Sequence, residues 1–252
     1  MNTQQQIPFK ILLIGDNGID QYQFGTVNRI SPEAPVPIIN YTHTETKSGM
    51  AANVKTNLEA LGCLVDLVHG TKTSVKTRII DSRSKQQLIR IDQDLISKPV
   101  KVDFLTINTY DAVVVSDYNK GSVDYKVLEQ IKRYFSGPIF IDTKKTDLAK
   151  LEGFIIKINS KEFLELTTTP SDNTDLIVTY GAQGATWKNK TYPVEQVEVS
   201  DVCGAGDTFL AALACGYLKY NNFEDAIKFA IRASAVTVQH IGVYAPTLEE
   251  IQ

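Results

Sequence analysis

The residues best suited to chemistry lie in one short segment near the C-terminal end, Asp201-Val-Cys-Gly-Ala-Gly-Asp-Thr-Phe209. The apolar run Phe209–Leu218 predicts a helix, so Gly204–Asp207 should form its first turn. First-turn N–H groups are unpaired and carry partial positive charge, and the glycines let a phosphate approach them. A carboxylate beside such an anion site suits a base that deprotonates an attacking hydroxyl. The segment indicates phosphoryl transfer to a small molecule; the alternative is an ordinary helix start in which Asp207 complements the dipole.

Composition restricts the class of protein. The chain has 252 residues, 43% of them hydrophobic, which is enough for one large core or two modest ones. A net charge of −3 and a pI of about 5.7 argue against a nucleic-acid partner or an anionic membrane. No apolar stretch reaches spanning length, and the opening Met1–Gln6 lacks the pattern of a signal peptide.

Cysteine and histidine usage also restricts the class. The three cysteines are widely spaced and odd in number, which favours a reducing cytoplasm over a disulfide framework. The three histidines are scattered, and none joins a Cys/His cluster with zinc-ligand spacing. These residues are Cys63, Cys203, Cys215, His43, His69 and His240.

The elements that must position these residues alternate as in an α/β protein. Short apolar runs predict buried parallel strands, and runs with helical spacing predict helices between them. The expected strands are 9–14, 112–115, 139–141, 154–156 and 176–178, and the expected helices are 51–61, 123–135, 161–166, 205–219 and 223–238. No repeat, low-complexity tract or linker interrupts the chain, so we expect a single domain over residues 1–252.

Two segments break this rhythm, residues 21–46 and 76–94, and together they are called the lid below. They alternate and turn without helical periodicity, and Pro32, Pro35 and Pro37 favour an edge strand in the first of them. Two such segments around one helix predict a small β-sheet standing off the main sheet, which could cover a ligand or pair with a second subunit. The alternative is an irregular surface excursion.

Two common nucleotide motifs are missing from the sequence. It contains no Gly-x-x-x-x-Gly-Lys-[Ser/Thr], so it is not a P-loop enzyme. It has no Gly-x-Gly-x-x-Gly after the first strand, which weakens a dinucleotide-binding interpretation.

Several segments resemble one known family in the right order. The Gly204–Asp207 turn resembles the signature of the ribokinase family of sugar kinases. Arg29-Ile-Ser-Pro-Glu-Ala-Pro-Val-Pro37 resembles one branch of it, the D-glycero-D-manno-heptose 7-phosphate kinases. Matches run from about residue 9 to residue 248, and the remaining similar segments are Gly15–Asp20, Gly49–Asn53, Gln86–Asp92, Ser116–Gly121, Asp142–Lys144 and Asn159–Glu162.

The resemblance implies a fold and a set of sites. It implies a three-layer α/β/α fold with a mainly parallel central sheet and a small β-sheet lid. For catalysis it implies Asp207 as general base, with Gly204, Ala205 and Gly206 stabilising the transferring group. The implied substrate-binding residues are Asp20, Arg29, Gly49, Asn53, Gln87, Arg90, Lys120 and Lys144.

A nucleotide and a metal are implied as well. Asn159, Thr179, Gly181 and Gly184 would bind ATP, and Glu162 with Asn159 would position Mg²⁺. One carboxylate suffices for a magnesium ion that keeps its waters and uses nucleotide oxygens as ligands. The four cationic side chains among the substrate residues suit a substrate that already bears a phosphate, although any one of them is more often a solvated surface charge.

The sequence also departs from the family. After Leu61–Gly70 the segment Thr71–Thr77 follows almost at once, where the family has a further helix and strand, so that side of the sheet must close differently. Met50 stands in place of a glycine near the sugar. Cys203 stands in place of a threonine. We interpret this first as a plain small-residue replacement; the alternative is an unusually acidic thiol at a helix N-terminus. The similarity covers a kinase domain only, without the nucleotidyltransferase domain of some relatives.

The expected function is therefore ATP-dependent phosphorylation of a sugar phosphate, first of all D-glycero-D-manno-heptose 7-phosphate to the 1,7-bisphosphate. The alternatives are a kinase for another sugar or sugar phosphate, and a non-catalytic sugar-phosphate-binding protein. We expect no nucleic-acid or membrane partner and a homodimer formed through the lid. Its apolar candidates are Val36, Ile38, Ile79 and Ile89.

Overall fold

The structure is a computed structural model that describes residues 8–251, so the opening segment Met1–Gln6 lies outside it. The strands are β1 (Lys10–Ile30), β2 (Pro37–Met50), β3 (Leu64–Asp81), β4 (Gln86–Gln93), β5 (Ala112–Asp117), β6 (Ile139–Thr143), β7 (Ile155–Asn159), β8 (Asp175–Thr179), β9 (Ala185–Trp187) and β10 (Lys190–Tyr192). The α-helices are α1 (Ala51–Ala60), α2 (Tyr125–Tyr134), α3 (Ser160–Leu164), α4 (Ala205–Tyr220) and α5 (Phe223–Thr237). Short 3₁₀ turns occur at Ile107–Thr109, Leu148–Leu151 and Gly181–Gln183.

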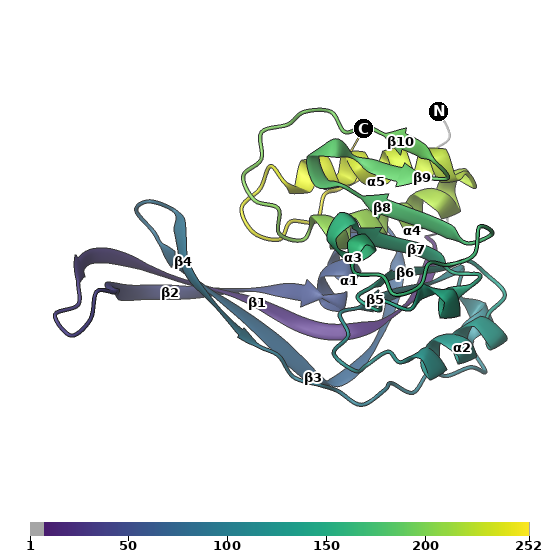
Figure 1. The fold of residues 1–252 in the computed structure, drawn as a ribbon, viewed down its shortest axis with the longest axis horizontal. Helices are drawn as coiled ribbons and strands as arrows, with labels where there is room; N and C mark the ends of the chain where they lie inside the picture. The colour runs from purple at the N-terminus through teal and green to yellow at the C-terminus, as the bar shows by residue number, and fades with distance from the viewer. Residues whose placement is uncertain (1–7, 252) are drawn as a thin grey trace.

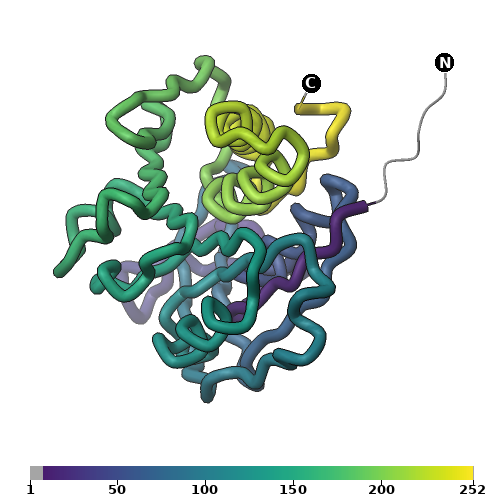
Figure 2. The backbone as a smooth tube through the Cα atoms, turned by 90° about the vertical axis from the view of Figure 1, so that its right-hand side faces the viewer, coloured from purple at the N-terminus to yellow at the C-terminus, as the bar shows by residue number. Residues whose placement is uncertain are grey.

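One sheet runs through the molecule in the order β10-β9-β8-β7-β6-β5-β1-β3-β4, and β2 pairs with β1 outside this path. The central pairs from β3 through β1 and β5 to β8 are parallel, and the outer pairs are antiparallel. Helices cover both faces of the sheet, as Figures 1 and 2 show. The expected three-layer α/β/α fold is confirmed.

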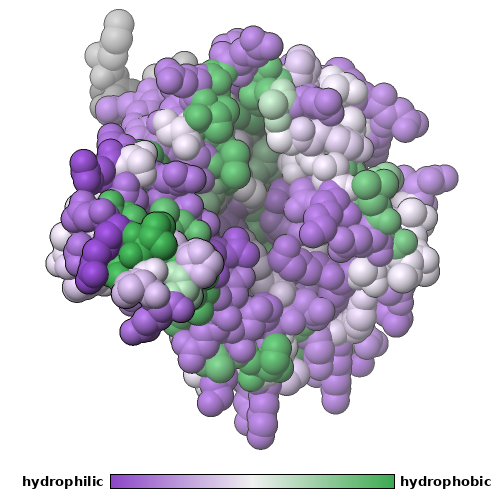
Figure 3. Space-filling view, turned by 60° about the vertical axis from the view of Figure 1, so that its left-hand side comes forward, coloured by the Kyte–Doolittle hydropathy of each residue, from purple (hydrophilic) through white to green (hydrophobic). Residues whose placement is uncertain are grey.

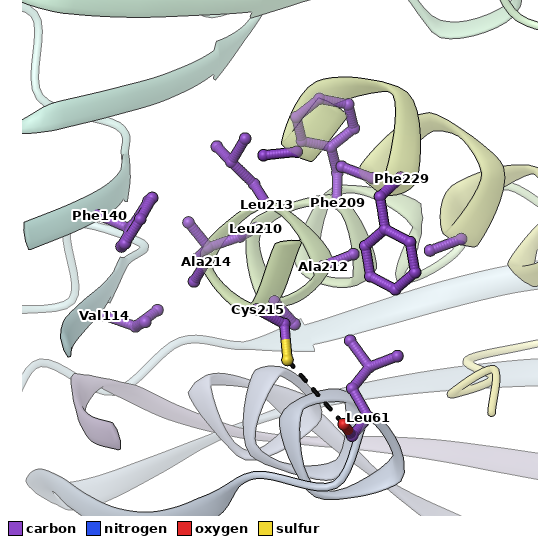
Figure 4. Close-up of a cluster of buried hydrophobic side chains, with 14 of the residues drawn as sticks. Leu61, Val114, Phe140, Phe209, Leu210, Ala212, Leu213, Ala214, Cys215 and Phe229 are labelled. Carbon is purple, nitrogen blue, oxygen red and sulfur yellow. Dashed lines mark hydrogen bonds between the residues drawn. The ribbon is translucent and has the colours of Figure 1, made fainter. Parts of the chain in front are cut away.

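Each face of the sheet has its own hydrophobic core. On one face α1, α4 and α5 pack on the sheet, and α4 is buried through most of its length because it is apolar on nearly all sides. Figure 4 shows α4 side chains between the sheet and α5. On the other face the amphipathic helix α2 buries Val127, Leu128 and Ile131. Its first turn is capped by Asp124, whose side chain accepts the Val127 N–H at 2.8 Å.

The lid differs from the expected separate sheet, because it continues the strands of the main sheet. Strand β1 is 21 residues long and β3 is 18 residues long, and both run from the body into the projecting arm seen in Figure 1. Their parallel pairing persists into the lid, with one register shift between Gly15 and Asn17. Strand β2 begins at Pro37 and pairs only with β1, so the proline-rich segment does lead into an edge strand.

The missing helix and strand explain this continuity. In place of the further helix and strand that the resemblance implies, β3 passes straight on through His69, Gly70 and Thr71. Gly70 is buried at this point, and a Cβ there would lie 2.4 Å from Ser97 and Ser122. The sequence predicts that this side of the sheet closes differently from the family. In the structure, one uninterrupted strand closes it.

Candidate active site

The N-terminus of α4 forms the tight turn expected from the sequence. Gly204 precedes the helix with φ of 80°, a left-handed conformation that favours glycine, and Ala205 is the first helical residue. A Cβ on Gly206 would lie 3.1 Å from Nζ of Lys157, so only glycine fits there without movement of the lysine. The turn therefore presents bare backbone amides beside Asp207.

Asp207 is held by two neutral donors from distant parts of the chain. Asn53 Nδ2 on α1 donates to one carboxylate oxygen at 2.9 Å, and the Tyr118 hydroxyl donates to the other at 2.8 Å. The residue is only 6% exposed, and this burial raises its pKa to about 6 even though both donors favour the charged form. Asp207 is thus ionised at neutral pH yet close enough in pKa to accept a proton.

A buried ion pair lies directly behind the glycine turn. Lys157 Nζ on β7 is 2.6 Å from Asp142 Oδ2 at the end of β6, and their side chains are 3% and 19% exposed. Burial raises the pKa of Asp142, and Lys157 opposes this rise. The pair places a positive charge beneath the turn and a second carboxylate near Asp207.

On the lid side, Asp20 of β1 forms a buried salt bridge with Arg78 of β3. Arg78 also donates to Sγ of Cys203 at 3.6 Å, which links this pair to the segment before the glycine turn. Gly49 lies against Asp20, because a Cβ there would meet its Oδ2 at 2.7 Å. The structure therefore brings together Asp20, Gly49 and the α4 turn, as the sequence predicts.

Met50 and Cys203 are the two positions near the site at which the sequence departs from the family's residues. Met50 is buried and adopts φ of 52° and ψ of −132°, a conformation that L-residues rarely adopt and that glycine would enter freely. Of the two interpretations of Cys203, the plain small-residue replacement agrees with the structure, and the acidic thiol is wrong. Burial, with the nearby Asp201 carboxylate, raises the pKa of Cys203 to about 11.

The loop after β5 carries the Tyr118 hydroxyl to Asp207. Its shape is fixed by the buried carboxylate of Asp16, which accepts the backbone N–H groups of Tyr118, Lys120 and Ser122 at 2.9, 2.9 and 3.0 Å. The Lys120 ammonium group pairs with Asp94 at 2.6 Å.

Other predicted residues occupy the rim of the site. Lys144 Nζ lies 5.3 Å from the centre of the Tyr118 ring and pairs with Glu162 at 2.9 Å. Glu162 and Asn159 form a reciprocal capping box at the start of α3, each accepting the other's backbone N–H at 2.9 Å. The oxygens proposed for magnesium are therefore also used to fix this helix.

Three predicted substrate residues lie further out on the lid. Arg90 on β4 is opposite Arg78, but it is exposed and bound to Asp92 through two contacts of 2.8 and 2.9 Å. Gln87 is exposed beyond it, opposite Ile80. Arg29 lies nine residues past Asp20 along β1, which corresponds to ~30 Å of strand, so a direct contact of Arg29 with a sugar held by Asp20 is contradicted by the geometry.

A cavity of about 630 Å³ opens at the glycine turn, on the side away from the Asp20–Arg78 pair of the lid. Thr179, Gly181 and Gly184 line it from the hairpin between β8 and β9, and Ala205 and Gly206 line it from α4. Most of its wall is apolar and comes from the segment 194–202 and from α5. The lining suits a ligand with an apolar part against this wall and an anionic end at the α4 turn.

Sequence reasoning missed four residues of this site, although three lie in segments that it singled out. They are Arg78, Tyr118, Asp142 and Lys157. For Tyr118 the available signal was its position between the strand end and Lys120. For Lys157, a lysine in the otherwise apolar run Phe154–Ile158 was a signal of a buried charge.

Tyr118→Phe should move the acid limb of the pH profile. The wild-type kcat/KM is expected to fall as pH decreases through about 6, because Asp207 takes up a proton. Removing the hydroxyl that stabilises the carboxylate should raise this midpoint by about one pH unit, the worth of a hydrogen bond to a charged group. Tyr125→Phe is the matched control, since its hydroxyl donates to the Asp147 carbonyl at 3.1 Å away from Asp207. Identical profiles for both variants would contradict the role of Tyr118.

Sequence comparisons place this site among known proteins. The model of the pfkB family of carbohydrate kinases matches residues 50–251. A bifunctional protein HldE from Nitratiruptor sp. is 32% identical, over 96% of this chain and 64% of the relative. A protein of the same name from Pasteurella multocida is 29% identical, over 96% and 63%. The chain thus spans less than two thirds of these relatives, and the matches extend over 299 and 300 positions, so within them the relatives carry residues that this chain lacks.

Structural comparisons give the same fold. A ribokinase from Arabidopsis thaliana, solved with ribose and ATP, aligns with a TM-score of 0.73 and 16% identity, over 97% of this chain and 98% of that one. A ribokinase from Thermotoga maritima aligns with a TM-score of 0.70 and 18% identity, over 96% and 98%. No helix in residues 8–251 is long and apolar enough to cross a membrane.

Proposed function

The chain belongs to the pfkB family of carbohydrate kinases, and from this premise we propose that it phosphorylates a sugar phosphate at the expense of ATP. The observation that carries the proposal is the position of Asp207. It lies buried between the Asp20–Arg78 pair of the lid and the cavity behind the α4 turn, with a pKa of about 6. A binding protein needs no such base between two ligand sites, which argues against a non-catalytic role.

In the proposed reaction the chain's own residues orient the reactants and move one proton. Asp207 accepts the proton of the sugar hydroxyl as its oxygen bonds to the γ-phosphorus and the bond to the β-phosphate oxygen breaks. The amides of the Gly204–Asp207 turn donate to the transferring group, where negative charge is concentrated. ATP would occupy the cavity lined by Thr179, Gly181 and Gly184, with its phosphates at the turn.

Magnesium fits the residues present if most of its ligands are not protein atoms. Among residues 8–251, no cluster of three or more acidic, histidine or cysteine side chains could hold a metal ion. Glu162 supplies one carboxylate, and its oxygens already accept from Lys144 and the Asn159 amide. A bound magnesium ion would neutralise phosphate charge, and Glu162 would hold it through its waters. Glu162→Gln should therefore weaken the apparent magnesium affinity in a titration of activity.

The acceptor sugar would lie between α1 and the lid. Asp20 and the Asn53 amide would bind its hydroxyls, and the absence of a side chain at Gly49 leaves space beside Asp20. Lys120 and Lys144 at the rim, and Arg90 further out on the lid, have side chains that can turn from their present carboxylate partners to a phosphate. The resemblance to the heptose 7-phosphate kinases makes that sugar the first candidate. Met50, where the family has glycine, is the specific reason to consider another sugar phosphate.

The test is an ADP-release screen across heptose, hexose and pentose phosphates and the free sugars. We expect the heptose 7-phosphate to give the highest kcat/KM. Lys120→Ala should raise KM for the sugar phosphate much more than KM for ATP, and Lys101→Ala, in the segment before β5, serves as a control. Faster turnover of an unphosphorylated sugar than of every sugar phosphate would refute the proposed substrate class.

A homodimer through the lid is part of the proposal. The lid exposes apolar side chains along its length, and Figure 3, which brings the arm forward, shows apolar atoms gathered among hydrophilic ones. Val36 and Ile89 are 51% and 55% exposed, whereas Ile38 and Ile79 are already half-buried. Burying the exposed pair against a second lid would remove them from water.

Light scattering at micromolar protein should give the mass of a dimer. Ile89→Lys should shift the mass to that of a monomer, because the charge would have to be buried between the lids. A matched lysine at Leu164, which is 83% exposed on the body, should leave the dimer intact. A wild-type monomer with full kinase activity would refute the assembly.

A further inference from the structure

Two thiols meet on the far side of the core from the active site. Cys63 follows α1 at the start of β3, and Cys215 lies in the last turns of α4. Their sulfur atoms are 3.1 Å apart although 152 residues separate them in the sequence. Both side chains are buried, with 6% and 7% exposed. The kinase reaction proposed above uses neither of them.

The active-site residues Asn53 and Asp207 lie near the N-terminal ends of α1 and α4, and the cysteine pair lies towards the C-terminal ends of the same two helices. At their N-terminal ends, Asn53 of α1 contacts Asp207 of α4 at 2.9 Å. One turn further, Thr208 donates to Asn57 at 2.8 Å. The cysteines are the third contact of this series. Figure 4 shows Cys215 pointing from α4 towards Leu61, at the end of α1.

A small hollow gives access to one of the sulfurs. It has a volume of about 210 Å³ and is lined by Cys215, by Leu61 and Gly62, and by Lys219 from the next turn of α4. The hydrogen bond between the two thiols, and then the charge of Lys219, lower the pKa of the Cys215 thiol against the effect of burial. Cys215 lines the hollow and Cys63 does not, so Cys215 is the thiol that a small oxidant reaches first.

We propose that Cys63 and Cys215 form a reversible disulfide when the protein meets hydrogen peroxide. The Cys215 thiolate attacks one peroxide oxygen, the O–O bond breaks, and a sulfenic acid and hydroxide result. The Cys63 sulfur then attacks the Cys215 sulfur, its proton and the sulfenic hydroxyl leave as water, and the S–S bond forms. Overall two thiols are oxidised and one peroxide is reduced to two waters, and a thiol reductant reverses the bond.

The bond is expected to stabilise the enzyme rather than to inhibit it. The sulfurs are already in contact, so α1 and α4 need little movement to form the bond. A cross-link between residues so distant in sequence strongly restricts the unfolded chain. The oxidised protein should keep its kcat and unfold at a higher temperature, by roughly 5–10 °C.

The experiment treats the purified chain with stoichiometric hydrogen peroxide and counts free thiols after denaturation in a maleimide reagent. The wild type should fall from three thiols to one, and a non-reduced digest should contain the peptide that joins Cys63 to Cys215. The thermal shift should appear with the cross-link and disappear with dithiothreitol. Cys203→Ser is the matched control and should retain both the cross-link and the thermal shift.

Cys63→Ala and Cys215→Ala should each abolish the thermal shift. Should either variant fail to fold, the digest of the wild type decides alone. A digest in which Cys203 is the cross-linked residue, or in which Cys215 is converted to sulfinic acid without the 63–215 peptide, would overturn the proposal. A cross-linked protein that unfolds at an unchanged temperature and has lost its kcat would overturn the stabilising role of the bond.

Discussion

Asp207→Asn is expected to lower kcat by roughly 10²–10⁴-fold while ATP binding stays nearly unchanged. Asparagine keeps the size of the side chain and can still meet Asn53 and Tyr118, but it cannot take up the hydroxyl proton. The amides of the Gly204–Asp207 turn remain in place, so the nucleotide site is preserved. Single-turnover kinetics and calorimetric titration with ATP measure the two effects separately.

The same change should make the protein more stable at pH 8. Burial raises the pKa of Asp207 to about 6 in the folded state, above its value in the unfolded chain. The ionised side chain therefore disfavours the folded state increasingly as pH rises from the unfolded pKa to about 6, and fully above that. The corresponding cost is about 3 kcal/mol at pH 8 and vanishes below about pH 4. The Asn variant lacks this cost, so its melting temperature should exceed that of the wild type at pH 8 and match it near pH 4.

Asp124→Asn is the matched control for this experiment. Asp124 caps α2 on the other face of the sheet, and asparagine caps a helix equally well, so neither kcat nor stability should change. A fully active Asp207→Asn enzyme would remove the assignment of the base. An inactive variant that is also less stable at pH 8 would show that Asp207 acts through the structure of the site instead.

Much of the scaffold could be predicted from local pattern. The run Ala112–Val115 is buried on all sides in β5, and the amphipathic spacing of residues 123–135 contains α2. The Gly-Ala-Gly sequence fixes the α4 turn because Gly204 needs a left-handed backbone. These features depend on residues close together in the chain, where periodicity and backbone preference decide the structure.

The partners of the site depend on contacts that no local pattern contains. Arg78 reaches Asp20 because β3 pairs with β1 in parallel beyond Gly15, in a register set by the short passage at residues 69–73. The resemblance pointed to Arg90 and not to Arg78, and Arg90 lies one strand further out and faces solvent. Tyr118 meets Asp207 across 89 residues, through a loop shaped by Asp16.

The lid illustrates the same limit on a larger scale. Alternating residues and prolines predict extended segments at 21–46 and 76–94, but they do not show whether these segments start new strands. A strand of 21 residues is far longer than usual, so a separate sheet was the natural expectation. In this chain β1 and β3 stay paired as they leave the body, and β2 returns along β1 to α1, so continuous strands join the lid to the body.

Lys157→Met should destabilise the protein by about 3–5 kcal/mol, since it leaves Asp142 buried without its partner. The loss should depend on pH. Removing the lysine raises the pKa of Asp142 further, so the uncompensated carboxylate costs most at pH 8, and the deficit shrinks as pH falls and Asp142 takes up a proton. Urea unfolding at pH 5 and pH 8 measures both values.

The double variant Lys157→Met/Asp142→Leu separates the stability of the pair from its effect on catalysis. Two apolar side chains of similar size can replace a buried ion pair with little or no loss of stability, so the double variant should unfold close to the wild type. Its kcat should nevertheless be lower than that of the wild type, as for Lys157→Met alone. Both variants lack the positive charge beneath Gly206 that stabilises an anionic transferring group. Lys55→Met/Glu59→Gln removes an exposed pair on α1 and should leave the stability nearly unchanged, because a surface salt bridge contributes little. A double variant with restored stability and full kcat would mean that Lys157 serves the fold alone, and that the α4 turn attracts phosphate without its help.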